Sequence, residues 1–169
     1  MDKTYEPIAA QTLGSAVASV TFGSIPQTYT DLILISSPIA TTDGISLNIR
    51  FNGDAGSNYS RTVLSGYGAS TGSGSVRHSN VTRIGSNWQV GAGTGGPSPH
   101  IHNIQNYSNS TTFKTVVFRG NAFPYSGLSE VTGEIGLWRN TSAITSINIS
   151  ASSNFAVGST FTLYGIRAA

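Results

Sequence analysis

The chain has 169 residues, of which only 9% are charged, and its nine basic and seven acidic side chains leave a net charge of +2. Ser, Thr, Gly and Asn together occupy 76 positions, and 38% of the residues are apolar. This composition excludes an intrinsically disordered chain, which combines few apolar residues with a high net charge. It predicts one folded domain over residues 1–169, with a neutral surface rich in hydroxyl and amide groups.

Several other classes are excluded as well. The longest unbroken apolar run, Leu32–Ile35, has four residues, whereas a transmembrane helix needs about 20. The absence of cysteine excludes a disulfide scaffold, a Cys-bound zinc site and thiol catalysis, and is compatible with folding in a reducing cytoplasm. Residues Met1–Glu6 lack the charged start and apolar core of a signal peptide. A surplus of two positive charges does not indicate a nucleic-acid binder.

Helical periodicity is almost absent, while short β-branched and aromatic runs recur between Gly, Asn, Ser and Pro. About eleven short strands separated by turns are typical of an antiparallel β-sandwich or a barrel. In chain order, the expected strands are Tyr5–Thr12, Ala16–Phe22, Thr30–Ser36, Ile45–Phe51, Tyr59–Leu64, Trp88–Gly91, His100–Tyr107, Thr112–Arg119, Val131–Arg139, Ile144–Ser150 and Ser159–Ile166.

Several of these strands alternate between apolar and polar residues. In Ile45–Phe51 every odd position is apolar and every even one polar, which predicts a strand with one face on the core. The same alternation recurs in 146–150 and 160–164. Leu32–Ile35 is apolar on both faces, which favours a central strand that is covered on both sides, one cover being a neighbouring subunit.

Turn residues support the all-β interpretation. Asn52–Gly53 directly follows a strand and is a strong hairpin signal, and Asp43–Gly44 precedes one. Two stretches poor in packing side chains, 66–75 and 91–99, are expected to be long loops that are either functional or mobile.

Charge is distributed unevenly along the chain. Residues 55–129 contain no acid, and the first 54 residues have a net charge of −3. One interpretation is a basic face that meets an acidic partner. The other is that a chain with few charges shows such gaps by chance. The basic residues of the acid-free segment are Arg61, Arg77, Arg83, Lys114 and Arg119.

No residue pattern indicates a convincing catalytic site. A Gly-x-Ser-x-Gly elbow is absent, and no helix pattern follows the glycines at 91–96 that could make them a phosphate loop. Glu130 and Glu134 are four residues apart and could form a glycosidase pair. With seven acids in the whole chain, an enzyme is disfavoured.

His100 and His102 would point to the same face of a strand. Imidazole pairs suit zinc, iron or nickel, and some trimeric phage fibre tips stack such pairs around a threefold axis. Two ligands from one chain are too few for a metal site alone. The alternative is a pair of histidines that forms hydrogen bonds at a surface or a subunit contact.

Four segments and the chain end carry a family resemblance. The segments Val20–Ile35, Ile49–Ser60, Ile135–Ile147 and Phe155–Ile166, with the ending Tyr-Gly-Ile-Arg-Ala-Ala, resemble small virion structural proteins of tailed bacteriophages, particularly phages of aquatic bacteria. The resemblance implies a β-sandwich of jelly-roll type that assembles on a phage particle, and it brings no catalytic residue and no cofactor.

Within that resemblance, we expect a capsid decoration (cement) protein. Such proteins are commonly homotrimers that bind the major capsid protein on the outer head surface and reinforce capsomer junctions. The protein would be made in the host cytoplasm and located in the virion. The expected contact residues are an extended N-terminal arm at 1–12, with Lys3, Tyr5 and Glu6, and the basic middle, with Arg61, Arg77, Arg83 and Arg119.

Two other functions stay open. A tail fibre or receptor-binding tip subunit would contact host surface glycan through its Gly/Ser loops and tyrosines. A glycan-degrading enzyme would need the two glutamates discussed above.

Overall fold

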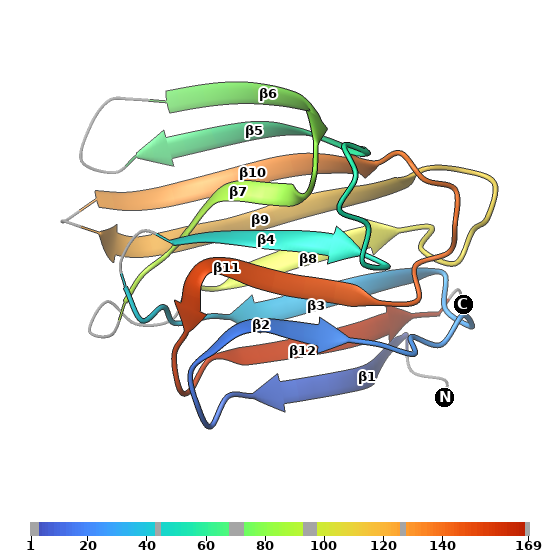
Figure 1. Ribbon diagram of the computed structural model, residues 1–169, viewed down its shortest axis with the longest axis horizontal. Helices are drawn as coiled ribbons and strands as arrows, with labels where there is room; N and C mark the ends of the chain where they lie inside the picture. Colours follow the sequence, from blue (N-terminus) through green and yellow to red (C-terminus); the bar gives the residue numbers. More distant parts are fainter. Residues whose placement is uncertain (1–3, 43–44, 68–72, 93–97, 126–127, 168–169) are drawn as a thin grey trace.

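The computed structural model describes residues 4–42, 45–67, 73–92, 98–125 and 128–167 (Figure 1). Within these ranges the protein is all-β, and its strands form two antiparallel sheets, which confirms the expected fold class. No helix among the described residues is long and apolar enough to cross a membrane. The strands are β1 (Tyr5–Thr12), β2 (Val17–Phe22), β3 (Asp31–Ser37), β4 (Ile45–Phe51), β5 (Tyr59–Tyr67), β6 (Ser73–Val81), β7 (Ile84–Val90), β8 (His100–Gln105), β9 (Lys114–Tyr125), β10 (Leu128–Trp138), β11 (Ile147–Phe155) and β12 (Thr160–Ile166).

The strand order is that of a jelly roll with two additions. The larger sheet begins β1-β12-β3-β8, and the smaller sheet is β2-β11-β4-β7. The chain changes sheet at nearly every connection, and only β5–β6, β8–β9 and β9–β10 stay within one sheet, which wraps the chain into a double-sheet sandwich. The pairs β5–β6 and β9–β10 extend the larger sheet to the order β1-β12-β3-β8-β9-β10-β5-β6. In Figure 1 this extension continues at the top, past the smaller sheet.

The core lies between the two sheets and follows the alternation in the sequence. In β4 the odd positions from Ile45 to Phe51 are all buried, and in β12 Phe161 and Leu163 are completely buried. Each such side chain contributes about 1.5–3 kcal/mol when it leaves water. At one end of the sandwich, Trp138 packs against Phe51 and Tyr59, with ring centroids 5.5 and 6.3 Å away.

The Asn52–Gly53 turn forms as predicted, but it does not close a hairpin. Both residues have positive φ angles (52° and 68°), and the Asp54 N–H donates to the Phe51 carbonyl over 2.9 Å. The strands on either side, β4 and β5, nevertheless lie in different sheets. The turn instead anchors the segment before β11, because the Asn52 side chain accepts from Thr145 N at 2.8 Å and donates to the Ala143 carbonyl at 2.8 Å.

Other differences concern the edges of the sandwich. Strand β6 was not expected, and part of it lies in the presumed loop 66–75. The residues expected as an N-terminal arm form the edge strand β1 from Tyr5 onward, paired with β12, while residues 1–3 lie outside the described residues. In β3, Leu32 and Leu34 are fully buried, whereas Ile35 on the other face is 41% exposed in the single chain.

Candidate functional site

The outer face of the larger sheet, on the side away from the sandwich core, carries a row of uncovered apolar side chains. Val131 is 67% exposed, Leu64 63% and Ile135 58%. Strand register places them together: Leu64 pairs with Gly133, Val131 pairs with Gly66, and the chain neighbours of Gly133, Thr132 and Glu134, belong to the opposite face. The row continues over Val117 and Ile35, which are also exposed. We call the residues Leu64, Val131, Ile135, Val117 and Ile35 the apolar face.

Strand β10 has the reverse of the usual polarity. Its buried positions include Glu130, Thr132 and Glu134, while Val131 and Ile135, which alternate with them, point to the open side. An antiparallel strand with one wet face ordinarily turns its apolar residues to the core. Exposed apolar groups that lie contiguously mark interaction sites on soluble proteins. The inversion therefore identifies the outer side of β10 as a surface that is suited to be covered.

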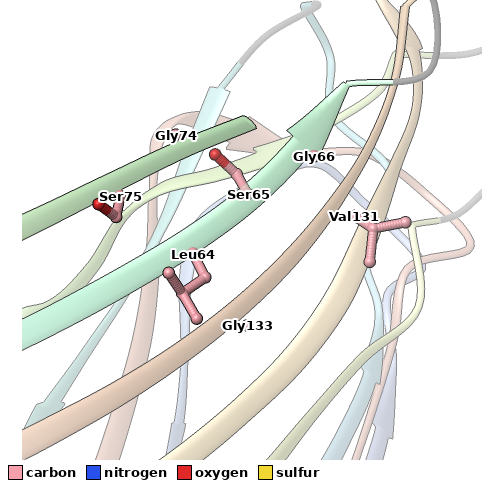
Figure 2. A pocket seen from close by; sticks show the side chains of 7 residues that line it. All are labelled: Leu64, Ser65, Gly66, Gly74, Ser75, Val131 and Gly133. Atoms are coloured by element: carbon pink, nitrogen blue, oxygen red, sulfur yellow. The ribbon is translucent and has the colours of Figure 1, made fainter. Parts of the chain in front are cut away.

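An open hollow of about 540 Å³ lies on this face at the end of β5, β6 and β10. Figure 2 shows the side chains of Leu64 and Val131 beside it, while Gly66 and Gly133 contribute only backbone. A Cβ added to either glycine would meet no atom within 4 Å. The hollow therefore exists because these positions lack side chains, and it offers room for a side chain of a partner.

Two of the expected basic contact residues border the apolar face. Arg119 pairs with Gly133 and Ile101, and Arg77 pairs with Thr62 on β5. Both arginines are exposed. In the described part of this face, from β8 to β6, no Asp or Glu points outward. The surface thus combines an apolar centre with a positive border, an arrangement that attracts an acidic partner surface.

The other basic residues do not share this face, so the expectation of a single basic face was wrong. Arg61 is buried on the inner side, with Nη1 3.8 Å from Glu134 Oε2. Arg83 follows β6 and lines the same cavity as Arg61, so it also lies on the inner side. Lys114 is completely buried, and its Nζ donates to the carbonyls of Thr112 and Thr141 at 2.6 and 3.0 Å. Alternation along β5 and β6 separates Arg61 from Arg77.

The expected N-terminal contact residues are divided. Lys3 lies outside the described residues, and Tyr5 is 57% exposed at the sheet edge. Glu6 is engaged within the chain: its Oε2 accepts from Tyr29 Oη at 3.0 Å, and its Oε1 lies 3.0 Å from Arg167 Nε. The Arg167 guanidinium also lies 5.4 Å from the centre of the Tyr29 ring. Glu6 thus joins the edge strand to the end of the chain.

His100 and His102 point to the same side, as predicted, but that side is the core. They are 1% and 0% exposed, and their rings pack on Phe118 with centroids 5.3 and 4.8 Å away. Burial lowers the pKa of His100 to about 3, opposed by a backbone hydrogen bond at Asn121. Burial and the neighbouring His100 lower the pKa of His102 as well. A metal shared between chains on a threefold axis cannot reach this buried pair, and the described residues hold no cluster of three or more metal-ligating side chains.

Glu130 and Glu134 do not have the geometry of a glycosidase pair. Residues four apart on a strand are separated by roughly 13 Å, whereas the two carboxyl groups of glycosidases lie about 5–9.5 Å apart. Both glutamates are buried. Burial raises the pKa of Glu130, opposed by a hydrogen bond from Thr132.

The sequence analysis missed the apolar face itself. Val131 and Ile135 alternate with Glu130 and Glu134 in the sequence, a pattern that ordinarily turns the apolar residues toward the core. Arg61, the buried partner of Glu134, lies in a strand whose other face carries Leu64, and this pairing across strands is not recorded by any local pattern.

Comparisons with models of known protein families, with curated proteins and with solved structures gave no match to this chain.

Proposed function

We propose that the protein is a non-enzymatic structural protein of a phage particle, a decoration (cement) protein that binds the outer surface of the head. The observation that carries this proposal is the inverted polarity of β10, which turns Val131 and Ile135 outward beside Arg119. The family resemblance of the sequence is the reason to propose a phage particle, and the apolar face is the surface proposed to bind it.

The partner surface that fits this face is apolar with acidic groups. If two copies met through this same face, Arg77 and Arg119 of one copy would approach the same arginines of the other copy. The described face from β8 to β6 has no outward acid that could balance these positive charges. Like charges at an interface are unfavourable. The face therefore suits a different surface, and we assign it to the major capsid protein. Contacts between copies in the proposed homotrimer would lie elsewhere on the sandwich.

The energetics favour several copies acting together. Completing the burial of a half-exposed Leu, Ile or Val contributes about 1 kcal/mol, so the apolar face supplies on the order of 5 kcal/mol. Association of two proteins costs an estimated 4–15 kcal/mol in lost freedom of motion. A single copy thus binds weakly, whereas a trimer multiplies the contacts and gains about 10²–10⁴-fold in avidity.

The test compares two matched substitutions in binding to undecorated heads. Val131 and Val157 are the same residue type and are 67% and 60% exposed, but Val157 lies between β11 and β12, away from the apolar face. We expect Val131→Asp to lose at least 10-fold in binding to heads in a sedimentation assay, and Val157→Asp to bind like the parent. Equal binding of both variants would refute the assignment of this face.

Location is tested independently by quantitative mass spectrometry of purified particles. A copy number comparable with that of the major capsid protein is expected. A ratio of a few per cent would contradict the proposal and favour a tail protein that contacts host glycan. Light scattering coupled to size-exclusion chromatography tests the trimer.

A further inference from the structure

Four arginines converge on the connection between β6 and β7, at 80–83. Arg50 Nε donates to the Thr82 carbonyl at 3.1 Å, and Arg139 Nη2 donates to Asn80 Oδ1 at 2.8 Å. The other two, Arg61 and Arg83, line a cavity of about 220 Å³ together with Val81 and Thr82. Asn80 itself has a positive φ of 57°, which an Asn tolerates better than most residues. The connection is thus held by Arg50 of β4 and by Arg139, which directly follows β10.

The charges at this cavity are not balanced. Glu134 lies 3.8 Å from Arg61, a distance too long for a hydrogen bond, and Glu134 Oε1 also accepts from the Gly85 N–H at 3.2 Å. No carboxylate among the described residues contacts Arg83. Arg61 Nη1 and Arg83 Nε are buried, and neither donates a hydrogen bond within the part of the chain that the structure describes. Two guanidinium groups therefore line the cavity, and the carboxylate described near them, Glu134, lies beside Arg61.

Electrostatics agree with this geometry. Burial lowers the pKa of Arg61; Glu134 opposes the shift, and the like charge of Arg83 adds to it. Buried polar groups are almost always hydrogen-bonded, and guanidinium groups bind planar or tetrahedral oxyanions with two parallel N–H donors. An anion in the cavity would satisfy both requirements, since it balances the surplus charge and accepts from the buried donors.

We propose that the cavity between Arg61 and Arg83 binds a small oxyanion. Its volume is below the range of about 300–1,000 Å³ that drug-sized ligands occupy, which fits an ion of the size of phosphate. The site is on the inner side of the sheet extension, away from the apolar face, so it is independent of head binding. A bound anion would hold the β6–β7 connection and the edge strand β7 against β5.

The experiment measures phosphate binding to the full chain by isothermal titration calorimetry, with thermal unfolding in phosphate and in chloride at equal ionic strength as a second readout. A ligand that binds only the folded state raises the unfolding temperature. We expect phosphate to bind and to raise this temperature relative to chloride. Acetate distinguishes two kinds of ligand. An effect equal to that of phosphate assigns the site to a carboxylate, and a smaller effect assigns it to a free tetrahedral anion. No effect of either anion relative to chloride overturns the proposal.

Variants at matched positions locate the effect. We expect Arg83→Gln to weaken phosphate binding at least 10-fold. Arg83→Lys keeps the charge but loses the paired donors, so its affinity for phosphate should lie between those of the parent protein and Arg83→Gln. Arg77→Gln is the control, because Arg77 lies on the adjoining strand β6 but faces the side of the sheet opposite to Arg61. If Arg77→Gln weakened binding as much as Arg83→Gln, the effect would come from general charge and the site would be refuted. Circular dichroism in chloride shows that each variant is folded before the comparison is made.

Discussion

The buried ion pair between Arg61 and Glu134 allows the energetics of the inverted strand to be tested. Both side chains are almost completely buried, at 4% and 0% exposure, and Nη1 lies 3.8 Å from Oε2. Glu134→Gln keeps the shape and removes the charge, so the Arg61 cation is left without its carboxylate. Breaking a buried pair from one side typically costs about 3–5 kcal/mol. Because the 3.8 Å separation is long, we expect a loss of about 3 kcal/mol in the free energy of unfolding. For a protein of this size that lowers the unfolding temperature by about 6–12 °C.

Urea unfolding at pH 7, followed by the fluorescence of the buried Trp138, measures this loss. Glu130→Gln is the control, since Glu130 is also buried on β10 but accepts a hydrogen bond from Thr132. We expect it to lose less than about 1 kcal/mol, because the amide can still accept that bond. The double variant Arg61→Met/Glu134→Leu should return to within about 1 kcal/mol of the parent, as apolar replacements of buried pairs do. The reasoning fails if Glu134→Gln is no less stable than Glu130→Gln.

Two further predictions concern the packing around His100. Gly120→Ala should lose about 1–3 kcal/mol of the free energy of unfolding in urea, because its Cβ would lie 2.5 Å from Phe118 Cζ and 2.6 Å from His100 Cδ2. The control Gly133→Ala should be neutral, since its Cβ would meet no atom within 4 Å. Equal losses in the two variants would contradict the packing described. The pKa of His100 is lowered from 6.5 to about 3. The stability linked to it is therefore complete above pH 6.5 and is lost as the pH falls toward 3, by about 3 kcal/mol at pH 4. His100→Gln, which does not titrate, should show a shallower fall between pH 7 and pH 4, and parallel curves would count against this linkage.

The fold could be predicted from the sequence because its main strands carry a local signal. The alternation in β4 and β12 specifies a strand with one buried face without reference to any other part of the chain. Strand β6 carries no such signal: Ser73–Val81 contains two valines among polar residues. It is a strand because β5 offers it a free edge, with Thr62 opposite Arg77 and Leu64 opposite Ser75. Pairing of this kind depends on tertiary structure, which no local pattern records.

The Asn52–Gly53 turn shows the same limit. Its backbone conformation follows from two residues that adopt positive φ angles easily. The partner of β4 does not follow from the turn, because a jelly roll pairs β4 with β11 and β7, which lie 33 or more residues away along the chain. The residues of the turn fix a local bend, and the packing of the two sheets decides what the bend connects.

The candidate face was hidden from sequence analysis for a related reason. The gap in acids at 55–129 suggests one positive region, but alternation distributes Arg61 and Arg77 to opposite sides of the sheet. Which side of β10 is the inner one depends on β7, the edge strand of the smaller sheet, which packs against β9, β10 and β5. No residue of β10 alone carries that information.

The two hairpins that enlarge the jelly roll also explain why β10 is inverted. Over β1-β12-β3-β8 the smaller sheet supplies an apolar cover, and the facing side chains include Leu32, Leu34, Phe161 and Leu163. Beyond β8 the cover narrows to β7, so the inner side of β10 and β5 is closed by the edge of the smaller sheet rather than by its centre. The buried charge of Glu134 is tolerated there because it is paired with Arg61. The outer side of these strands holds Val131, Ile135 and Leu64, which gain most when a partner covers them.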